Sequence, residues 1–177
     1  MTDVPIFDSD AWRLTDQERQ LTTQARELGE TRFADRASRY DREAKFPIEN
    51  YRDFHDAGLL GICIPSKYGG HGANLRAYAL TAAEVGRYCG STALTWNMHV
   101  CSCLWSGAMA DDLEMDRVVR ERHHETRSVH YRRILDDGAI YSQPFSEGGS
   151  AAAGTVAFST TAVRCDGGWV IRGKKIF

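Results

Sequence analysis

Residues 91–108 have the sequence STALTWNMHVCSCLWSGA, which contains no Lys, Arg, Asp or Glu. A helix with one face in water carries polar and charged residues on that face, so this stretch predicts a helix that is buried on all sides. Asn97 and His99 are polar groups within it. Because a buried polar group needs a partner, they either form satisfied hydrogen bonds in the core or line a ligand cavity. We expect this helix at the centre of a helical bundle.

The segments before it also have helical patterns. Thr15-Asp16-Gln17-Glu18 has the form of a capping box, and apolar residues then recur at helical intervals up to Ala44. A shorter helix is expected from Pro47 to Gly58, where the glycine can end it in a left-handed conformation. For the next helix the pattern predicts an inner face made of Leu75, Tyr78, Ala79, Ala82, Ala83 and Gly86.

After residue 108 the pattern changes from helix to strand. The stretch from Met115 to about Arg133, rich in Arg and Glu, is expected to be the last helix. The segments expected to form an antiparallel meander are Ala139–Gln143, Thr155–Arg164, the hairpin turn Asp166-Gly167-Gly168, Trp169–Ile171 and Lys175–Phe177.

Helices followed by strands indicate an α+β fold. We expect an N-terminal all-α helical domain at residues 1–136 and the first strands of an antiparallel β middle domain at residues 137–177. The last residues, Ile176 and Phe177, place an apolar strand at the end of the sequence, and such an edge is normally paired or covered. We therefore expect the chain to be the front part of a longer protein.

The composition excludes several classes of protein. Of the 177 residues 42% are hydrophobic and 26% charged, which is typical of a globular protein, and no stretch predicts a membrane span. The 22 Lys and Arg against 24 Asp and Glu give a net charge of -2, which provides no overall field for nucleic acid. The 5 cysteines lack metal-ligand spacing and are expected to be reduced. With no targeting pattern at the start, a cytoplasmic location is the simplest expectation.

Three clusters are candidates for sites. His123, His124, Glu125 and His130 lack the His-Glu-x-x-His spacing, so a solvated helix face is favoured over a metal site. The arginines of the same stretch alternate with acids, which likewise favours a solvated face over a nucleic-acid surface. The loop of residues 143–150 either connects two elements flexibly or holds a phosphate or the polar edge of a heterocycle on its backbone N–H groups.

Four groups of segments carry a resemblance to a known family. They are Phe54–Ile62 (FHDAGLLGI) with Ile64–Gly72 (IPSKYGGHG), then Ala83–Arg87 (AEVGR) with Ser91–Leu94 (STAL), then Ser146-Glu147, and finally Val170–Phe177 (VIRGKKIF). In this order, from about Thr15 to the last residue, the chain resembles the acyl-CoA dehydrogenase family. The resemblance implies an N-terminal helical domain, a middle β domain and a C-terminal four-helix bundle that is absent from this chain. It also implies FAD, held between the middle domain, the bundle and a neighbouring subunit.

The resemblance implies roles for particular residues. Phe145 and Ser146 match positions that face the flavin pyrimidine ring, and Phe177 matches an aromatic side chain beside the isoalloxazine. Ser150 is the candidate contact for the FAD pyrophosphate or the CoA arm, although residues 146–153 (SEGGSAAA) depart from the usual Thr-Glu-Pro-x-Ala-Gly-Ser-Asp. The residues that match the border of the acyl cavity are Ala93, Trp96 and Asn97.

The implied activity is α,β-dehydrogenation of an acyl-CoA thioester in fatty acid metabolism, with electrons passed to an electron-transferring flavoprotein. A homodimer or homotetramer is implied as well. In relatives the catalytic base is a Glu of the C-terminal bundle, so no catalytic residue is expected in this chain, and Glu147 is not at the position of the base. The first alternative is a flavin-dependent monooxygenase or acyl-CoA oxidase of the same fold. The second is a non-catalytic helical binding protein that uses its Arg-rich helix.

Overall fold

The computed structural model describes residues 12–147 and 158–176. The chain divides into two compact units, Met1–Tyr141 and Ser142–Phe177. The first unit contains α1 (Asp16–Leu28), the π-helical turn η1 (Gly29–Phe33), α2 (Ala34–Glu43), α3 (Ile48–Asp56), the 3₁₀ turns η2 (Leu59–Gly61) and η3 (Ser66–Tyr68), α4 (Leu75–Tyr88), α5 (Gly90–Ser106), α6 (Ala108–Asp111) and α7 (Arg117–Asp137). The second contains the strands β1 (Thr161–Cys165) and β2 (Gly168–Arg172). Helices followed by a small antiparallel sheet confirm the expected fold class.

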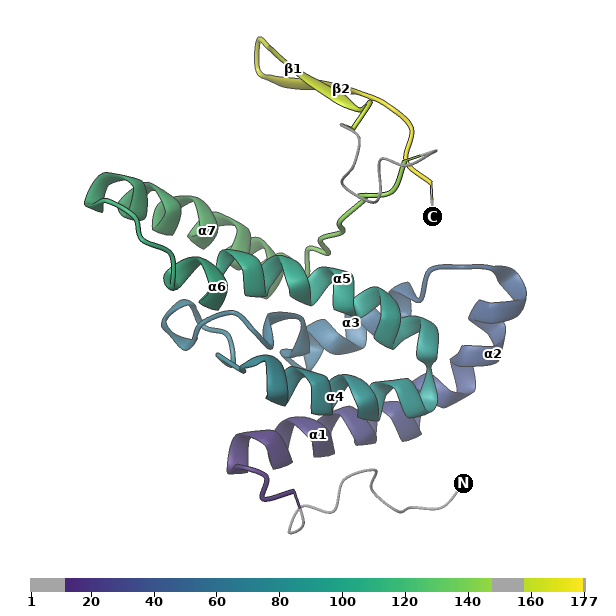
Figure 1. Ribbon diagram of the computed structural model, residues 1–177. Helices are drawn as coiled ribbons and strands as arrows, with labels where there is room; N and C mark the ends of the chain where they lie inside the picture. Colours follow the sequence, from purple (N-terminus) through teal and green to yellow (C-terminus); the bar gives the residue numbers. More distant parts are fainter. Residues whose placement is uncertain (1–11, 148–157, 177) are drawn as a thin grey trace. The chain divides into compact units, whose positions relative to one another are not determined.

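The core of the first unit lies where α3, α4 and α5 meet. Figure 1 shows α4 lying alongside α1 on one side and α5 on the other. At the centre the rings of Phe54 and Trp96 stack with 4.6 Å between their centroids, and Phe33 meets Phe54 edge-on at 5.2 Å. Aromatic side chains of this size contribute much of the apolar area that a core buries. These contacts join η1, α3 and α5.

The local signals at the helix ends are confirmed. Thr15 Oγ1 accepts a hydrogen bond from the Glu18 N–H at 3.2 Å, and Glu18 Oε2 accepts one from the Thr15 N–H at 2.8 Å, which is the reciprocal capping box. Gly58 follows α3 with φ of 73°, the left-handed conformation that glycine adopts without a steric penalty.

The predicted inner face of α4 is wrong in part. Leu75 is 65% exposed, whereas Glu84 is fully buried. The Glu84 carboxylate accepts hydrogen bonds from Arg26 at 2.9 Å and from Arg87 at 3.1 Å. A charged residue with partners can occupy an inward position, so the helix is rotated relative to a face chosen from apolar and small residues alone.

The prediction that the charge-free helix is buried on all sides is also wrong. In α5 the side chains of Trp96, His99, Val100 and Cys103 point into the core, whereas Leu94, Met98 and Trp105 are exposed. Absence of charge therefore does not mean burial here: one side of α5 faces the core of the unit, and the opposite side is an uncharged surface.

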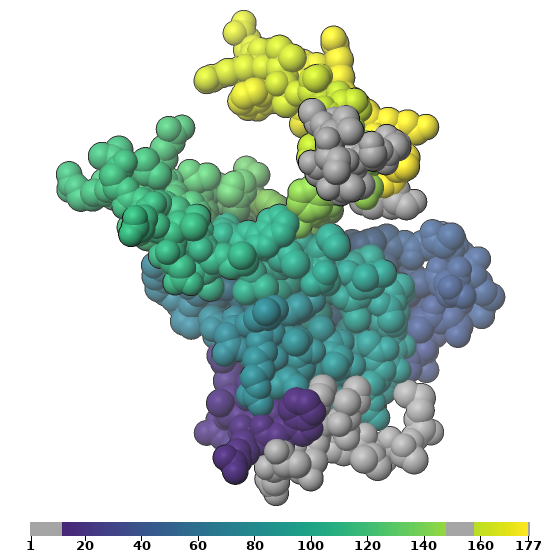
Figure 2. Space-filling view, in the orientation of Figure 1, coloured from purple at the N-terminus to yellow at the C-terminus, as the bar shows by residue number. Residues whose placement is uncertain are grey.

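Helix α7 is buried only in its second half. Its buried side chains are Arg127, Tyr131 and Ile134, and they pack against the segment that holds η2 and η3. Figure 2 shows that the beginning of α7 projects from the packed body of the first unit. No helix within the described ranges has the length and apolarity needed to cross a membrane.

The second unit is built on one hairpin. Strands β1 and β2 pair antiparallel, with Thr161 opposite Arg172 and Cys165 opposite Gly168. The turn is confirmed at Asp166–Gly167, where Gly167 has φ of 80°. Residues 139–143 and 175–176 were expected to form strands and do not, because neither segment is paired in a sheet among the described residues. Phe177, the last residue of the second of these segments, lies outside the described residues. The first residues of the expected strand 155–164, up to 157, lie outside the described residues.

Candidate functional site

The three residues that match the border of an acyl cavity lie on two sides of α5. Ala93 and Asn97 are half-buried on one flank of the helix. Asn97 Oδ1 accepts a hydrogen bond from the Tyr78 hydroxyl of α4 at 3.1 Å. Trp96 is fully buried between Phe54 and Tyr78, so it belongs to the core behind that flank and not to its surface.

His99, the second polar residue of the helix, is a satisfied core residue. Its Nε2 lies 3.0 Å from the Leu60 carbonyl oxygen, and its Nδ1 accepts from the Tyr141 N–H at 3.1 Å. These contacts assign the neutral tautomer with the proton on Nε2. Burial lowers the pKa of His99, although the bond to Leu60 opposes that shift. Of the two interpretations for His99, the hydrogen-bonded core holds.

The second unit contains a buried carboxylate that joins three segments of the chain. Glu147 Oε2 accepts from the Ser159 N–H and from the Ser159 hydroxyl, both at 2.6 Å, and Oε1 accepts from the Thr160 N–H at 3.1 Å and from Lys175 Nζ at 2.7 Å. We call Glu147, Ser159, Thr160 and Lys175 the Glu147 clamp. The hydrogen bonds from Lys175, Ser159 and Thr160 hold the pKa of Glu147 well below its usual range, so the group remains a carboxylate.

The clamp fixes the segment that carries Phe145 and Ser146. Lys175 Nζ also reaches the Phe145 carbonyl oxygen at 3.4 Å, and the Ile176 N–H donates to the Ser146 carbonyl oxygen at 3.1 Å. The Phe145 side chain is half exposed. Within the described ranges, the Ser146 hydroxyl has no hydrogen-bond partner. The segment therefore presents an aromatic ring and a hydroxyl from a backbone that is held in place.

Glycine is required where the last segment passes the clamp. A Cβ atom at Gly173 would lie 2.8 Å from the Thr160 Cα atom, closer than real Cβ contacts. Only a residue without a side chain lets the two backbones approach so closely. Gly173 is thus the part of the VIRGKKIF motif that allows Lys175 to reach Glu147.

The clamp was not predicted from the sequence. Glu147 and Lys175 are 28 positions apart, and no local pattern connects them. Of the other predicted cofactor contacts, Ser150 and Phe177 lie outside the described residues.

The histidine cluster of α7 forms no metal site. Across residues 12–147 and 158–176 no group of three or more His, Cys, Asp or Glu is placed to hold a metal ion. His124 Nδ1 instead lies 2.6 Å from Arg127 Nη2 and 3.2 Å from the Tyr68 hydroxyl. All five cysteines are free of disulfides.

Comparisons with solved structures identify the fold. Butyryl-CoA dehydrogenase from Megasphaera elsdenii matches with a TM-score of 0.67 and 24% identity over 93% of this chain and 40% of its own. A nitrososynthase from Micromonospora carbonacea matches with a TM-score of 0.71 and 22% identity over 92% of this chain and 38% of its own. At this level of identity the likeness shows a common fold.

The family follows from the sequence comparison. The family described as "Acyl-CoA dehydrogenase, N-terminal domain" matches residues 15–109. A curated relative, the probable acyl-CoA dehydrogenase YngJ of Bacillus subtilis, is 28% identical over 93% of this chain and 40% of its own length. The chain belongs to the acyl-CoA dehydrogenase family. It spans about 40% of the length of such relatives.

Proposed function

We propose that the full-length protein that contains this chain is an FAD-dependent acyl-CoA dehydrogenase. Membership of the family supports this proposal. The observation that supports particular residues is the Glu147 clamp, which holds the segment of Phe145 and Ser146. In the proposal α5 contributes Ala93 and Asn97 to an acyl cavity, and the clamped segment contributes Phe145 and Ser146 to the flavin site.

The residues of the clamped segment fit a flavin ring in their chemistry. A hydroxyl without a described partner can donate to a ring carbonyl or nitrogen, and a half-exposed aromatic side chain can lie against an aromatic ring system. When bound, FAD would supply the acceptor for the hydrogen that leaves the β-carbon of the acyl group. Ser150 and Phe177 remain proposed contacts of the same cofactor.

The role of the clamp in this proposal is to position the segment, and Glu147 is not the base. Its four hydrogen-bond donors occupy both carboxylate oxygens and lower its pKa, whereas a catalytic base works best with a pKa near the operating pH. The base is therefore proposed to lie in a part of the protein that this chain does not include. The proposal also includes transfer of electrons to an electron-transferring flavoprotein and a role in fatty acid metabolism. It places the protein in the cytoplasm as a homodimer or homotetramer.

A second candidate is a flavin-dependent monooxygenase or oxidase of the same fold. It is favoured by the changed sequence of residues 146–153 and by the nitrososynthase among the solved structures of this fold. The two candidates differ in whether an acyl-CoA reduces the flavin without oxygen.

The test is an anaerobic titration of the full-length protein with acyl-CoA esters, followed by the visible absorbance of the flavin. Loss of the oxidised spectrum supports the dehydrogenase, and a flavin that stays oxidised contradicts it and favours the second candidate. Purification without flavin, together with salt-sensitive binding to a polyanion, would instead favour a non-catalytic binding protein.

Variants test the assignment of the clamp separately from activity. Glu147→Gln keeps the shape of the side chain but loses its charge, so we expect less flavin retained per protein after purification. Glu125→Gln, on the exposed side of α7, is the matched control and should retain flavin fully. Equal flavin content in the two variants would show that the clamp does not position the flavin site.

A further inference from the structure

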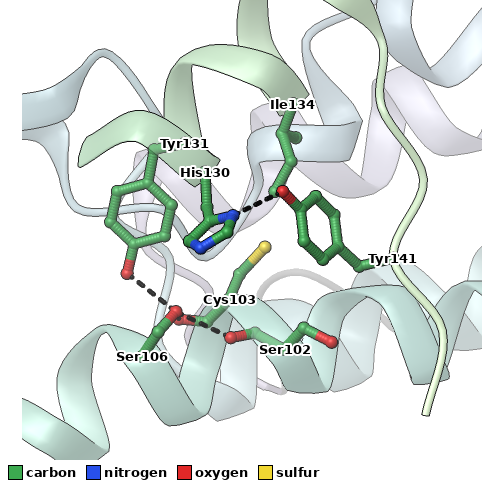
Figure 3. A pocket seen from close by; sticks show the side chains of 7 residues that line it. All are labelled: Ser102, Cys103, Ser106, His130, Tyr131, Ile134 and Tyr141. Carbon is green, nitrogen blue, oxygen red and sulfur yellow. Dashed lines mark hydrogen bonds between the residues drawn. The ribbon is translucent and has the colours of Figure 1, made fainter. Parts of the chain in front are cut away.

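A pocket of about 200 Å³ lies between α5 and α7 in the first unit. Its floor is made of Cys103, Tyr131 and Ile134, which are all nearly fully buried. Figure 3 shows the rings of Tyr131 and Tyr141 on opposite sides of the pocket, with the Cys103 sulfur pointing between them. The floor is therefore apolar and partly aromatic.

The rim of the pocket is polar. Tyr141 presents its hydroxyl to His130 Nδ1 at 2.7 Å, and Ser106 Oγ lies 3.1 Å from the Tyr131 hydroxyl. Ser102 completes the rim on α5. None of the described side chains that line the pocket belongs to Lys, Arg, Asp or Glu. A pocket lined by an apolar floor, with no lysine, arginine or carboxylate among its described side chains, suits a neutral ligand.

The pocket is separate from the flank of α5 proposed for the acyl group. Ser102 follows Asn97 by five positions, which places it about 140° further around a helix with about 100° per residue. Asn97 contacts Tyr78 of α4, whereas Ser106, on the side of Ser102, contacts Tyr131 of α7. The two flanks are divided by the exposed side chains of the helix, including Met98.

The size of the pocket limits what it can hold. An apolar cavity of about 150 Å³ accommodates benzene, so one of about 200 Å³ accommodates a six-membered ring with one small substituent. Burial raises the pKa of the Cys103 thiol to about 12, which keeps the floor neutral and without a strong nucleophile. A ring would lie on this floor between the two tyrosines.

We propose that the pocket between α5 and α7 binds a small neutral aromatic ligand that carries one hydroxyl group, as phenol does. The ring occupies the floor of Cys103, Tyr131 and Ile134. The hydroxyl of the ligand lies at the rim and donates a hydrogen bond to the oxygen of Tyr141. The Tyr141 hydroxyl in turn donates a hydrogen bond to His130 Nδ1. This site is independent of the flavin and acyl sites of the proposed function.

Phenol and benzene are the probes, and the ring-proton resonances of His130 in NMR titrations of the purified protein are the readout. We expect phenol to cause a saturable shift and to bind about 5- to 10-fold more tightly than benzene, the factor of one net hydrogen bond. Tyr141→Phe should remove that preference and leave benzene binding unchanged. A preference for phenol that persists in Tyr141→Phe would overturn the assigned hydrogen bond.

A second variant tests the place of binding. Ser102→Phe fills the pocket from its half-exposed rim, where the larger ring does not disturb the core, and should weaken both probes more than 10-fold. Ser91→Phe, at an exposed position in the first turn of α5, is the control and should bind both probes as the unchanged protein does. Absence of saturable binding, or equal binding by the two variants, would overturn the proposal. Circular dichroism confirms that each variant is folded.

Discussion

The buried guanidinium of Arg127 gives the sharpest test of how α7 is held. Its side chain is 1% exposed, and it donates to the Tyr68 hydroxyl at 3.2 Å, to the Ser106 carbonyl oxygen at 2.8 Å and to Asp111 at 2.6 Å. The guanidinium also lies over the ring of Tyr68, 5.2 Å from its centroid. One residue of α7 thus joins η3, the end of α5 and α6. We predict that Arg127→Met destabilises the protein by about 3 kcal/mol.

This magnitude follows from what each partner loses. Breaking a buried ion pair costs about 3–5 kcal/mol when the remaining charge stays buried. The Asp111 side chain is 33% exposed and can recover water, and the Ser106 carbonyl still accepts from His123 Nε2 at 3.1 Å. Both facts move the expected cost to the lower end of that range. A methionine of similar length also retains part of the packing of the arginine stem.

Urea denaturation followed by circular dichroism measures the change in the free energy of unfolding. The expected loss corresponds to a fall in Tm of about 6–12 °C for a chain of this size. Arg132→Met, at an exposed position on the same helix, is the control and should change the stability by less than about 0.5 kcal/mol. Equal stabilities for the two variants would refute the argument that the Arg127 contacts hold α7.

Other predictions follow from single contacts. Trp96→Ala should cost about 3–5 kcal/mol in urea denaturation, because it empties the centre of the core. Gly173→Ala should cost about 1–3 kcal/mol, because the new methyl group meets Thr160. The pKa of His99 is lowered in the folded state, so its contribution to stability is complete above about pH 6.5 and is lost as the pH falls. The urea midpoint of the protein should therefore drop toward pH 5, and it should drop less steeply in His99→Gln. Met98→Lys should change the stability by less than about 0.5 kcal/mol, because Met98 is already 40% exposed.

Local chemistry made part of the fold predictable. The capping box at Thr15, the left-handed Gly58 and the turn at Gly167 each depend on residues that are neighbours in sequence, and all three are present. The face that each helix turns inward depends on more distant partners. Glu84 pairs with Arg87 of the same helix and with Arg26 of α1, and the pairing with Arg26 is not visible in the pattern of α4 itself.

The same distinction applies to the candidate site. Phe145 and Ser146 are proposed as flavin contacts through the resemblance to a family, whereas the clamp that fixes them is a property of the folded second unit. Glu147 is buried among donors that come from residues 159, 160 and 175, and no periodicity links these positions. A buried carboxylate is identified from its partners, and those are known only once the chain is folded.

Helix α5 shows why a charge-free sequence can have two different causes. Residues such as Trp96 and Val100 lack charge because they form the core. Leu94, Met98 and Trp105 are exposed in the first unit, where charged side chains would cost little stability, so folding of this unit does not explain why they are uncharged. In the proposed function the neighbouring flank with Ala93 and Asn97 borders the acyl cavity, and the need to exclude water from that cavity accounts for uncharged side chains beside it. The charge-free stretch is therefore explained by burial on its inner side. On the side that the first unit leaves exposed, it is explained in the proposed function by a binding surface.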